Sequence, residues 1–152
     1  MATDVDALAT VADYQFGAGA GAALFEGDLV VQGTGSGRPQ QILADGDRIV
    51  SYGTDGRFTL GVAGGRRLRS VLSPPTARVV VGDDSEPFVR EGRNVFAKFV
   101  RDVDPAVRPG DEVLVEHYAG DLLAVGRAEL SADAMRDFDT GMAVKVRNSV
   151  PE

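Results

Sequence analysis

Two short stretches of this sequence carry its most chemically informative side chains. The first, residues 88–100, reads FVREGRNVFAKFV and places arginines, an amide and a lysine around a glycine; the second, residues 141–150, reads GMAVKVRNSV and has a similar combination. Guanidinium and ammonium groups donate hydrogen bonds to phosphate oxygens, and glycine lets an anion approach the backbone closely. Neither stretch pairs a nucleophile with a base, so the expected chemistry is the binding of a polyanion.

Lysine is rare in this chain, which has 14 arginines and two lysines, Lys98 and Lys145. Both lysines lie inside apolar runs that are typical of strands, residues 95–100 and 142–146. Successive side chains of a strand point to opposite faces, so either lysine is also explained by a solvent-facing position without a function. Both interpretations stay open at this point.

Length and composition predict one or two small domains with a real core, because the chain has 152 residues of which 43% are hydrophobic. No stretch approaches the roughly 18 apolar residues that cross a bilayer. The acidic N-terminal residues lack the basic flank and apolar core of a signal peptide. We therefore expect a cytoplasmic protein that does not bind membranes.

The absence of cysteine excludes disulfides, thiol catalysis and cysteine-based zinc sites. His117 is the only histidine, and no Cys-His or Ser-His arrangement can be built around it. We therefore expect no catalytic residues, no metal and no cofactor. A carboxylate-based enzyme remains the alternative. The net charge of −7, with abundant aspartate and little lysine, fits a halophilic archaeal protein whose acidic surface serves solubility.

The first half of the chain predicts a small α+β domain over residues 1–73. Residues 1–12 fit either a short amphipathic helix or a frayed terminus, and a helical turn is expected over 20–25. From Asp28 onward, short strands alternate with turn signals such as Asp45-Gly46, which predicts a meander of about four strands. Residues 65–72 predict a helix, and Ser73-Pro74-Pro75 ends it and marks a domain boundary.

The second half predicts a domain rich in strands over residues 76–150. Expected strands cover residues 77–81, 95–100, 112–117, 122–130 and 141–150, and expected helices cover 86–91 and 132–139, the second of which ends at Gly141. In the last strand, alternation predicts Met142, Val144 and Val146 on one face and Ala143, Lys145 and Arg147 on the other.

Three further motifs are weaker. Gly17, Gly19 and Ala22 match a GxGxxA dinucleotide fingerprint, but no strand precedes them, so a glycine-rich loop is favoured. The segment GTGSGR, residues 33–38, lacks the lysine of a P-loop and is interpreted as a hairpin tip. The arginines of GRRLRSVL, residues 65–72, fit either a solvated helix face or a binding cluster.

Residues 76–150 resemble a PUA domain, the RNA-binding module named for pseudouridine synthases and archaeosine transglycosylases. The matching segments are ARVVV, EPFVREGRNVFAKFV, PGDEVLV, LLAVGRAELSADAM and GMAVKVRN, in the order of the family. The resemblance implies a mixed β pseudo-barrel with short helices. The first half, through ADYQFGAGAGAALF and the hairpins after it, resembles the small α+β domain that precedes the PUA module in archaeal tRNA-guanine transglycosylases.

The resemblance implies binding of structured RNA, with tRNA as the expected partner, through the glycine corner, the strand after it and the last strand. Carried over by position, the implied RNA-binding residues are Arg90, Gly92, Arg93, Asn94, Lys98, Lys145, Arg147 and Asn148. The large catalytic barrel of the transglycosylases does not fit in a chain of this length. A non-catalytic RNA-binding protein is thus the leading interpretation, and an accessory subunit of a separate tRNA-modifying enzyme is the alternative.

Overall fold

A computed structural model describes residues 5–33, 39–53 and 55–151, and the chain forms two compact units, Met1–Leu72 and Ser73–Glu152. Most of the predicted GTGSGR tip lies outside the described residues. Among the described residues, no helix has the length and apolar character needed to cross a bilayer.

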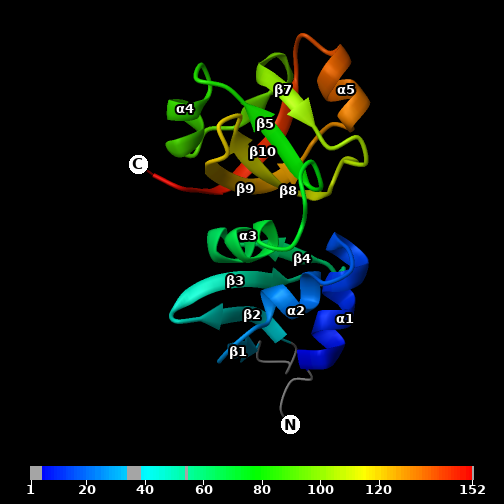
Figure 1. Cartoon of the computed structure of the whole chain (residues 1–152), viewed down its shortest axis with the longest axis vertical. Helices are drawn as coiled ribbons and strands as arrows, with labels where there is room; N and C mark the ends of the chain where they lie inside the picture. The colour runs from blue at the N-terminus through cyan, green and yellow to red at the C-terminus, as the bar shows by residue number, and fades with distance from the viewer. Residues whose placement is uncertain (1–4, 34–38, 54, 152) are drawn as a thin grey trace. The chain divides into compact units, whose positions relative to one another are not determined.

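The first unit combines three helices with an antiparallel sheet of four strands in chain order, β1-β2-β3-β4 (Figure 1). Asp45 and Gly46, which connect two of these strands, both have positive φ angles, as the predicted tight hairpin turn requires. The elements are α1 (Val5–Phe16), α2 (Ala20–Leu24), β1 (Val30–Gly33), β2 (Pro39–Ala44), β3 (Asp47–Tyr52), β4 (Phe58–Leu60) and α3 (Val62–Arg69).

Close backbone contacts hold the helices of this unit in place. A Cβ atom added at Gly21 would clash with the carbonyl of Ala9, and one added at Gly64 would clash with the carbonyl of Ile49. The glycines therefore let α2 lie against α1 and α3 lie against β3. Helix α1 extends to Phe16, beyond the predicted end at residue 12, because Phe16 is buried in the core.

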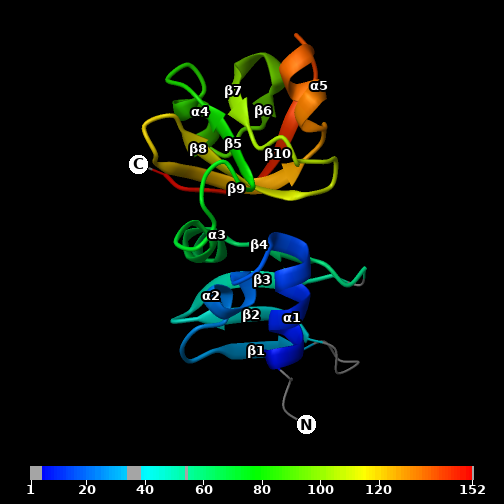
Figure 2. The same ribbon diagram turned by 45° about the vertical axis from the view of Figure 1, so that its right-hand side comes forward.

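The second unit is built around a mixed sheet of six strands in the order β6-β10-β9-β8-β5-β7 (Figures 1 and 2). Strands β5 and β8 are parallel, and the other neighbours are antiparallel. The elements are β5 (Arg78–Val81), α4 (Glu86–Arg90), β6 (Val95–Phe96), the 3-10 turn η1 (Ala97–Phe99), β7 (Val100–Val103), β8 (Glu112–His117), β9 (Leu122–Ala128), α5 (Ala132–Asp137) and β10 (Met142–Ser149).

The core of the second unit consists mainly of valine, alanine and leucine from these strands, joined by Met135 of α5. Valine favours the pleated, half-buried surface of a strand, which explains why the sequence pattern was informative here. The α+β class and the mixed β architecture with short helices that were predicted for this chain are confirmed.

The prediction of one continuous strand over residues 95–100 is wrong. Strand β6 pairs with β10 at one edge of the sheet, whereas β7 pairs with β5 at the opposite edge. The chain must turn between the two edges, and it does so in the 3-10 turn at Ala97–Phe99, where the Ala97 N–H donates to the carbonyl of Gly141 over 2.9 Å. Lys98 consequently projects from a turn and not from a strand.

Two boundaries near the C-terminus also differ from the prediction. Helix α5 ends at Asp137, four residues before Gly141, because Phe138 already has extended backbone angles. In β10 the predicted alternation fails at its start, where Ala143 and Val144 are both fully buried, and register shifts interrupt the pairing with both neighbouring strands. Lys145 and Arg147 are exposed, as expected.

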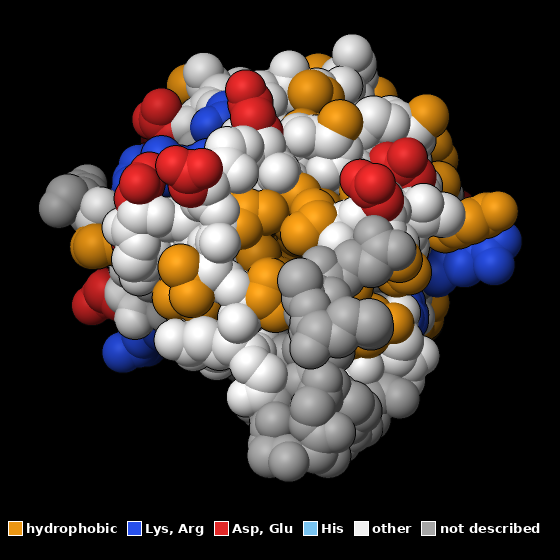
Figure 3. Space-filling view, turned by 90° about the horizontal axis from the view of Figure 1, so that it is seen from below, with side chains coloured by type: hydrophobic (Ala, Val, Ile, Leu, Met, Phe, Trp, Pro, Cys, Tyr) orange, Lys and Arg blue, Asp and Glu red, His pale blue; other side chains and the backbone are white. Residues whose placement is uncertain are grey.

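Acidic side chains border a cluster of exposed hydrophobic side chains on the face of the molecule that Figure 3 shows. Lys and Arg side chains also lie at the edges of this face, although the chain has a net charge of −7. Cations that bind an anionic partner must therefore be sought in local groups.

Candidate functional site

The predicted glycine corner is present between α4 and β6. Gly92 has a φ of +94°, a conformation that glycine adopts without strain, and its N–H donates to the carbonyl of Val89 over 2.9 Å. The Arg93 N–H donates to the carbonyl of Phe88 over 3.0 Å. These bonds end the short helix and direct the chain into β6.

The corner packs directly against the last strand. The side-chain oxygen of Asn94 accepts a hydrogen bond from the Val146 N–H over 2.9 Å. On the other side of the corner, Arg90 Nη1 donates to the carbonyl of Val150 over 3.1 Å. Asn94 and Arg90 thus fasten two segments that lie more than fifty residues apart in sequence.

Two of the predicted binding arginines are engaged in ion pairs inside the protein. Arg90 Nη2 lies 3.0 Å from Glu86 Oε2, and only 14% of its side chain is exposed. Arg147 makes a bidentate pair with the buried Glu112, with 2.9 Å between Nη2 and Oε2. Their geometry is that of structural residues, because a ligand would have to displace a carboxylate from each.

Three other predicted cations form no ion pair within the described part of the chain. The Arg93 guanidinium lies 5.6 Å from the centre of the Phe88 ring, and the Lys98 ammonium lies 5.0 Å from that of Phe99. Lys145 lies opposite Arg127 across the β10–β9 ladder. Arg127 is bound to Glu129, which raises the pKa of the Arg127 guanidinium through a hydrogen bond.

The remaining predicted residue, Asn148, is exposed on β10 and lies opposite Val125 of β9, after a register shift. The structure thus brings the corner and the last strand together. It separates the predicted set into structural residues, Arg90, Asn94 and Arg147, and exposed cations, Arg93, Lys98 and Lys145.

Arg101 is a further exposed cation that the sequence analysis missed. Its guanidinium lies 4.5 Å from the centre of the Tyr118 ring, and it has no carboxylate partner among the described residues. Arg101 and Lys98 share a pocket of about 350 Å³ that is also lined by Gly82, Asp83, Asp84, Ser85 and Phe99. Arg101 directly follows the apolar run at residues 95–100 and lies three residues after Lys98. This spacing is the sequence feature that could have indicated Arg101 as a further binding cation.

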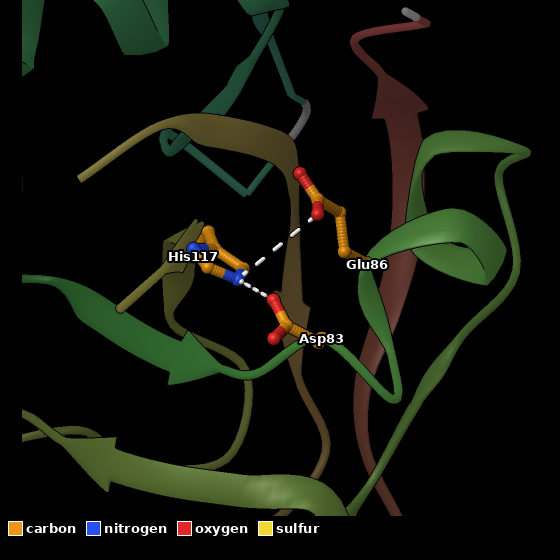
Figure 4. A group of neighbouring side chains, drawn as sticks. All are labelled: Asp83, Glu86 and His117. Carbon is orange, nitrogen blue, oxygen red and sulfur yellow. Dashed lines mark hydrogen bonds and ion pairs between the residues drawn. The ribbon is translucent and has the colours of Figure 1, made fainter. Parts of the chain in front are cut away.

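A cluster of ionisable groups borders this pocket. Asp83, Glu86 and His117 place one ligand atom each within 4.8 Å of one another, from the β5–α4 loop, α4 and β8 (Figure 4). A histidine with two carboxylates has the donor set of many transition-metal sites. The hydrogen bonds of the histidine decide whether this cluster fits a metal.

His117 is oriented as a hydrogen-bond donor toward Asp83. The Ala119 backbone N–H donates to His117 Nδ1 over 3.1 Å, so Nδ1 carries the lone pair and the ring proton is on Nε2. Nε2 lies 2.6 Å from Asp83 Oδ1 and donates to it, and it lies 4.0 Å from Glu86 Oε1. A metal-binding histidine would have the lone pair on Nε2 and would donate from Nδ1, so the cluster fits a hydrogen-bonded network.

No local sequence pattern predicts the Asp83–His117 contact. It follows from the parallel pairing of β5 with β8, in which Val81 is the partner of His117, so that the loop after β5 passes beside the histidine. His117 itself is buried, with only 8% of the residue exposed.

Two weaker motifs of the first unit have structural explanations. The segment before Gly17 and Gly19 is helix α1 and not a strand, which contradicts the dinucleotide fingerprint. In the arginine cluster of α3, Arg67 Nη1 donates to the carbonyls of Leu24 (3.0 Å) and Glu26 (2.7 Å). Arg67 thereby satisfies carbonyls at the end of α2, while Arg66 is exposed.

Comparisons with known proteins match both units. Residues 6–75 match the patch-forming domain C2 of tRNA-guanine transglycosylase, and residues 77–150 match the PUA domain. The tRNA-guanine(15) transglycosylase of Thermococcus kodakarensis is 48% identical over 92% of this chain, and that of Pyrococcus furiosus is 44% identical over 95%. The chain spans about a quarter of the length of these relatives, 24% and 25% respectively.

Two solved structures resemble the whole chain. A hypothetical protein from Pyrococcus horikoshii has a TM-score of 0.75 at 24% identity and is covered over 90% of its length, with 97% of this chain. A conserved PUA domain protein from Thermoplasma acidophilum has a TM-score of 0.68 at 21% identity, with coverage of 91% and 97%. At these identities the likeness supports the fold alone. Together, the matches identify this chain as a C2-type domain of the tRNA-guanine transglycosylase family, residues 6–75, followed by a PUA domain, residues 77–150.

Proposed function

We propose that the protein binds structured RNA, with tRNA as the first candidate, and that it catalyses no reaction. The observation that carries this proposal is the glycine corner packed on the last strand, with Arg93 and Lys145 exposed on these elements and Lys98 exposed on the 3-10 turn that follows the corner. None of the three cations has a carboxylate partner in the described structure. The names of the curated relatives connect the same domains to tRNA modification. This function agrees with the family of the second unit.

The chemistry of the exposed cations suits an RNA backbone. Guanidinium groups pair with phosphate in a bidentate way, and A-form RNA is recognised largely by its shape and its 2′-hydroxyls. Exposed Phe88 and Phe96, at 50% and 46%, flank the corner and offer rings for stacking with unpaired bases. The buried Glu112 and Glu116 are paired with Arg147 and Arg78, so they are poor candidates for acid–base catalysis.

Binding of the purified protein to total tRNA across a KCl series tests this proposal. The variant Arg93→Ala/Lys98→Ala/Lys145→Ala removes the exposed cations and spares the structural Arg90 and Arg147. We expect it to lose affinity and to reduce the slope of log K against log salt by about one for each lost phosphate contact.

The control is Arg66→Ala/Arg108→Ala, which removes two exposed positive charges outside the corner and the last strand and is compared with the test variant per charge removed. We expect this control to bind tRNA almost as the unchanged protein does. Equal losses in both variants would show that net charge, and not this surface, governs binding. Lack of saturable binding by the unchanged protein at every salt concentration would refute the proposal.

An accessory role beside a separate tRNA-modifying enzyme is the second candidate. The observation behind it is that residues 6–75 match a domain of tRNA-guanine transglycosylase and that a curated tRNA-guanine(15) transglycosylase is 48% identical to this chain. In that case, the protein co-purifies with a modification enzyme, and its affinity for tRNA rises when the enzyme is present. We also propose that it works in the cytoplasm of a halophilic archaeon, in agreement with its charge of −7.

A further inference from the structure

The pocket that contains Lys98 and Arg101 has walls of opposite charge. Asp83 and Asp84 lie on the β5–α4 loop, and the two cations lie on η1 and β7. Charges that share a pocket usually pair, yet among the described residues neither cation forms an ion pair with these aspartates. Each cation lies over an aromatic ring instead, at 5.0 Å for Lys98 and 4.5 Å for Arg101.

The Arg101 side chain is directed by its surroundings. A Cβ atom added at Gly82 would lie 3.0 Å from Arg101 Cδ and 3.1 Å from Nη1, so the glycine gives the arginine room to lie along the loop. The Tyr118 ring then lies beneath the guanidinium, and the Tyr118 N–H donates to the carbonyl of Val81 over 3.0 Å. Arg101 is therefore held at the pocket by packing and not by a carboxylate.

On the opposite wall of the pocket, Asp83 is held by His117. Its carboxylate accepts the Nε2 proton of His117 over 2.6 Å, although 75% of the Asp83 side chain is exposed (Figure 4). The other acidic neighbour of the histidine, Glu86, lies farther away at 4.0 Å and is bound to Arg90. His117 itself is fixed by the Ala119 N–H and contacts the Tyr118 ring, with 4.2 Å between the ring centres.

We propose that His117 is a positioning residue that keeps the Asp83 carboxylate from pairing with Lys98 and Arg101, and so leaves both cations available to a phosphate group of RNA. This inference rests on the proposed RNA-binding function. An exposed aspartate that loses its hydrogen-bond donor rotates freely on its loop, and two cations in the same pocket attract it. A phosphate would then have to displace it.

The variant His117→Phe tests this role, because phenylalanine keeps the ring volume and removes the donor. We expect tRNA affinity to fall about threefold, because the phosphate must first break an exposed ion pair between Asp83 and one of the two cations, and exposed ion pairs are weak. The double variant His117→Phe/Asp83→Asn removes the competing charge and should restore the affinity at least to that of the unchanged protein. If His117 had only a structural role, Asp83→Asn would raise the affinity of the unchanged protein and of His117→Phe by the same factor, whereas we expect a larger gain in His117→Phe.

The variant His117→Gln controls for effects of the substitution on folding. It retains an N–H donor for Asp83 and should bind tRNA nearly as well as the unchanged protein. The inference is overturned if His117→Phe binds tRNA normally, or if the double variant stays as weak as His117→Phe while both remain folded.

A measurement without RNA separates this inference from the proposed function. The ¹⁵N chemical shifts of the His117 ring identify the protonated nitrogen, and we expect the proton on Nε2. A proton on Nδ1 would overturn the inference even if tRNA binds. Conversely, failure of the unchanged protein to bind tRNA would refute the proposed function, while a proton on Nε2 would still agree with donation from His117 to Asp83.

Discussion

Replacing Arg147 with alanine should destabilise the PUA domain strongly, although sequence analysis places this residue among the RNA-binding cations. Arg147 and Glu112 form a bidentate pair, and only 4% of the Glu112 side chain is exposed. Without the arginine, a carboxylate remains buried between β9 and β5 without its bidentate partner. Breaking a buried pair in this way costs about 3 to 5 kcal/mol.

Partial exposure reduces this estimate. The Arg147 side chain is 30% exposed, so water reaches one end of the pair, and Arg127 lies opposite Glu112 on the neighbouring strand. We therefore expect the free energy of unfolding to fall by about 2 to 3 kcal/mol. Urea unfolding followed by circular dichroism measures this change, with Lys145→Ala as the control from the same strand, for which we expect less than about 0.5 kcal/mol.

The conservative variant Arg147→Lys separates the two possible roles of this residue. Lysine keeps the charge and loses the bidentate geometry, so stability should still fall while tRNA affinity at a temperature below unfolding stays near normal. A loss of stability below about 1 kcal/mol in Arg147→Ala would refute the reasoning. Arg147 would then return to the set of candidate RNA ligands.

Three further predictions concern stability. Ser131 accepts the Ala134 N–H over 3.2 Å at the start of α5, so Ser131→Ala should cost about 1 kcal/mol in urea unfolding, and no change would show that the cap is dispensable. Gly64→Ala places a methyl group against the Ile49 carbonyl, so the first unit of this variant should unfold at a lower urea concentration than that of the control Gly27→Ala. The Cβ atom of the control meets open space, and the positive φ of Gly27 adds some backbone strain to it. The unfolding temperature should rise with KCl, because salt screens the repulsion of a −7 chain, and an unchanged temperature would count against the halophilic assignment.

Local sequence patterns predicted much of the fold. Asp45-Gly46 predicted a hairpin turn, and both residues have the positive φ angles that this turn requires. Gly92 predicted the end of a helix and a corner, and it has a φ of +94°. Such features depend on neighbours within a few residues, so one sequence contains the information that decides them.

Local patterns failed where distant segments meet. The run at residues 95–100 is apolar enough for one strand, but its two ends belong to opposite edges of the sheet, and the turn at Ala97–Phe99 follows from that topology. Similarly, the presence of Arg147 in a strand does not reveal that Glu112, 35 residues earlier, binds it.

Local sequence patterns were enough to predict the class of the chain, its turns, the glycine corner and the stretches that supply cations, because backbone preference and hydrophobic periodicity act over short distances. Which of the cations are available depends on the three-dimensional arrangement of the strands. Arg90 and Arg147 are bound to carboxylates, whereas Lys98 and Arg101 share a pocket beside an aspartate that His117 holds. Charge pairing depends on distances in space, and strand order sets those distances.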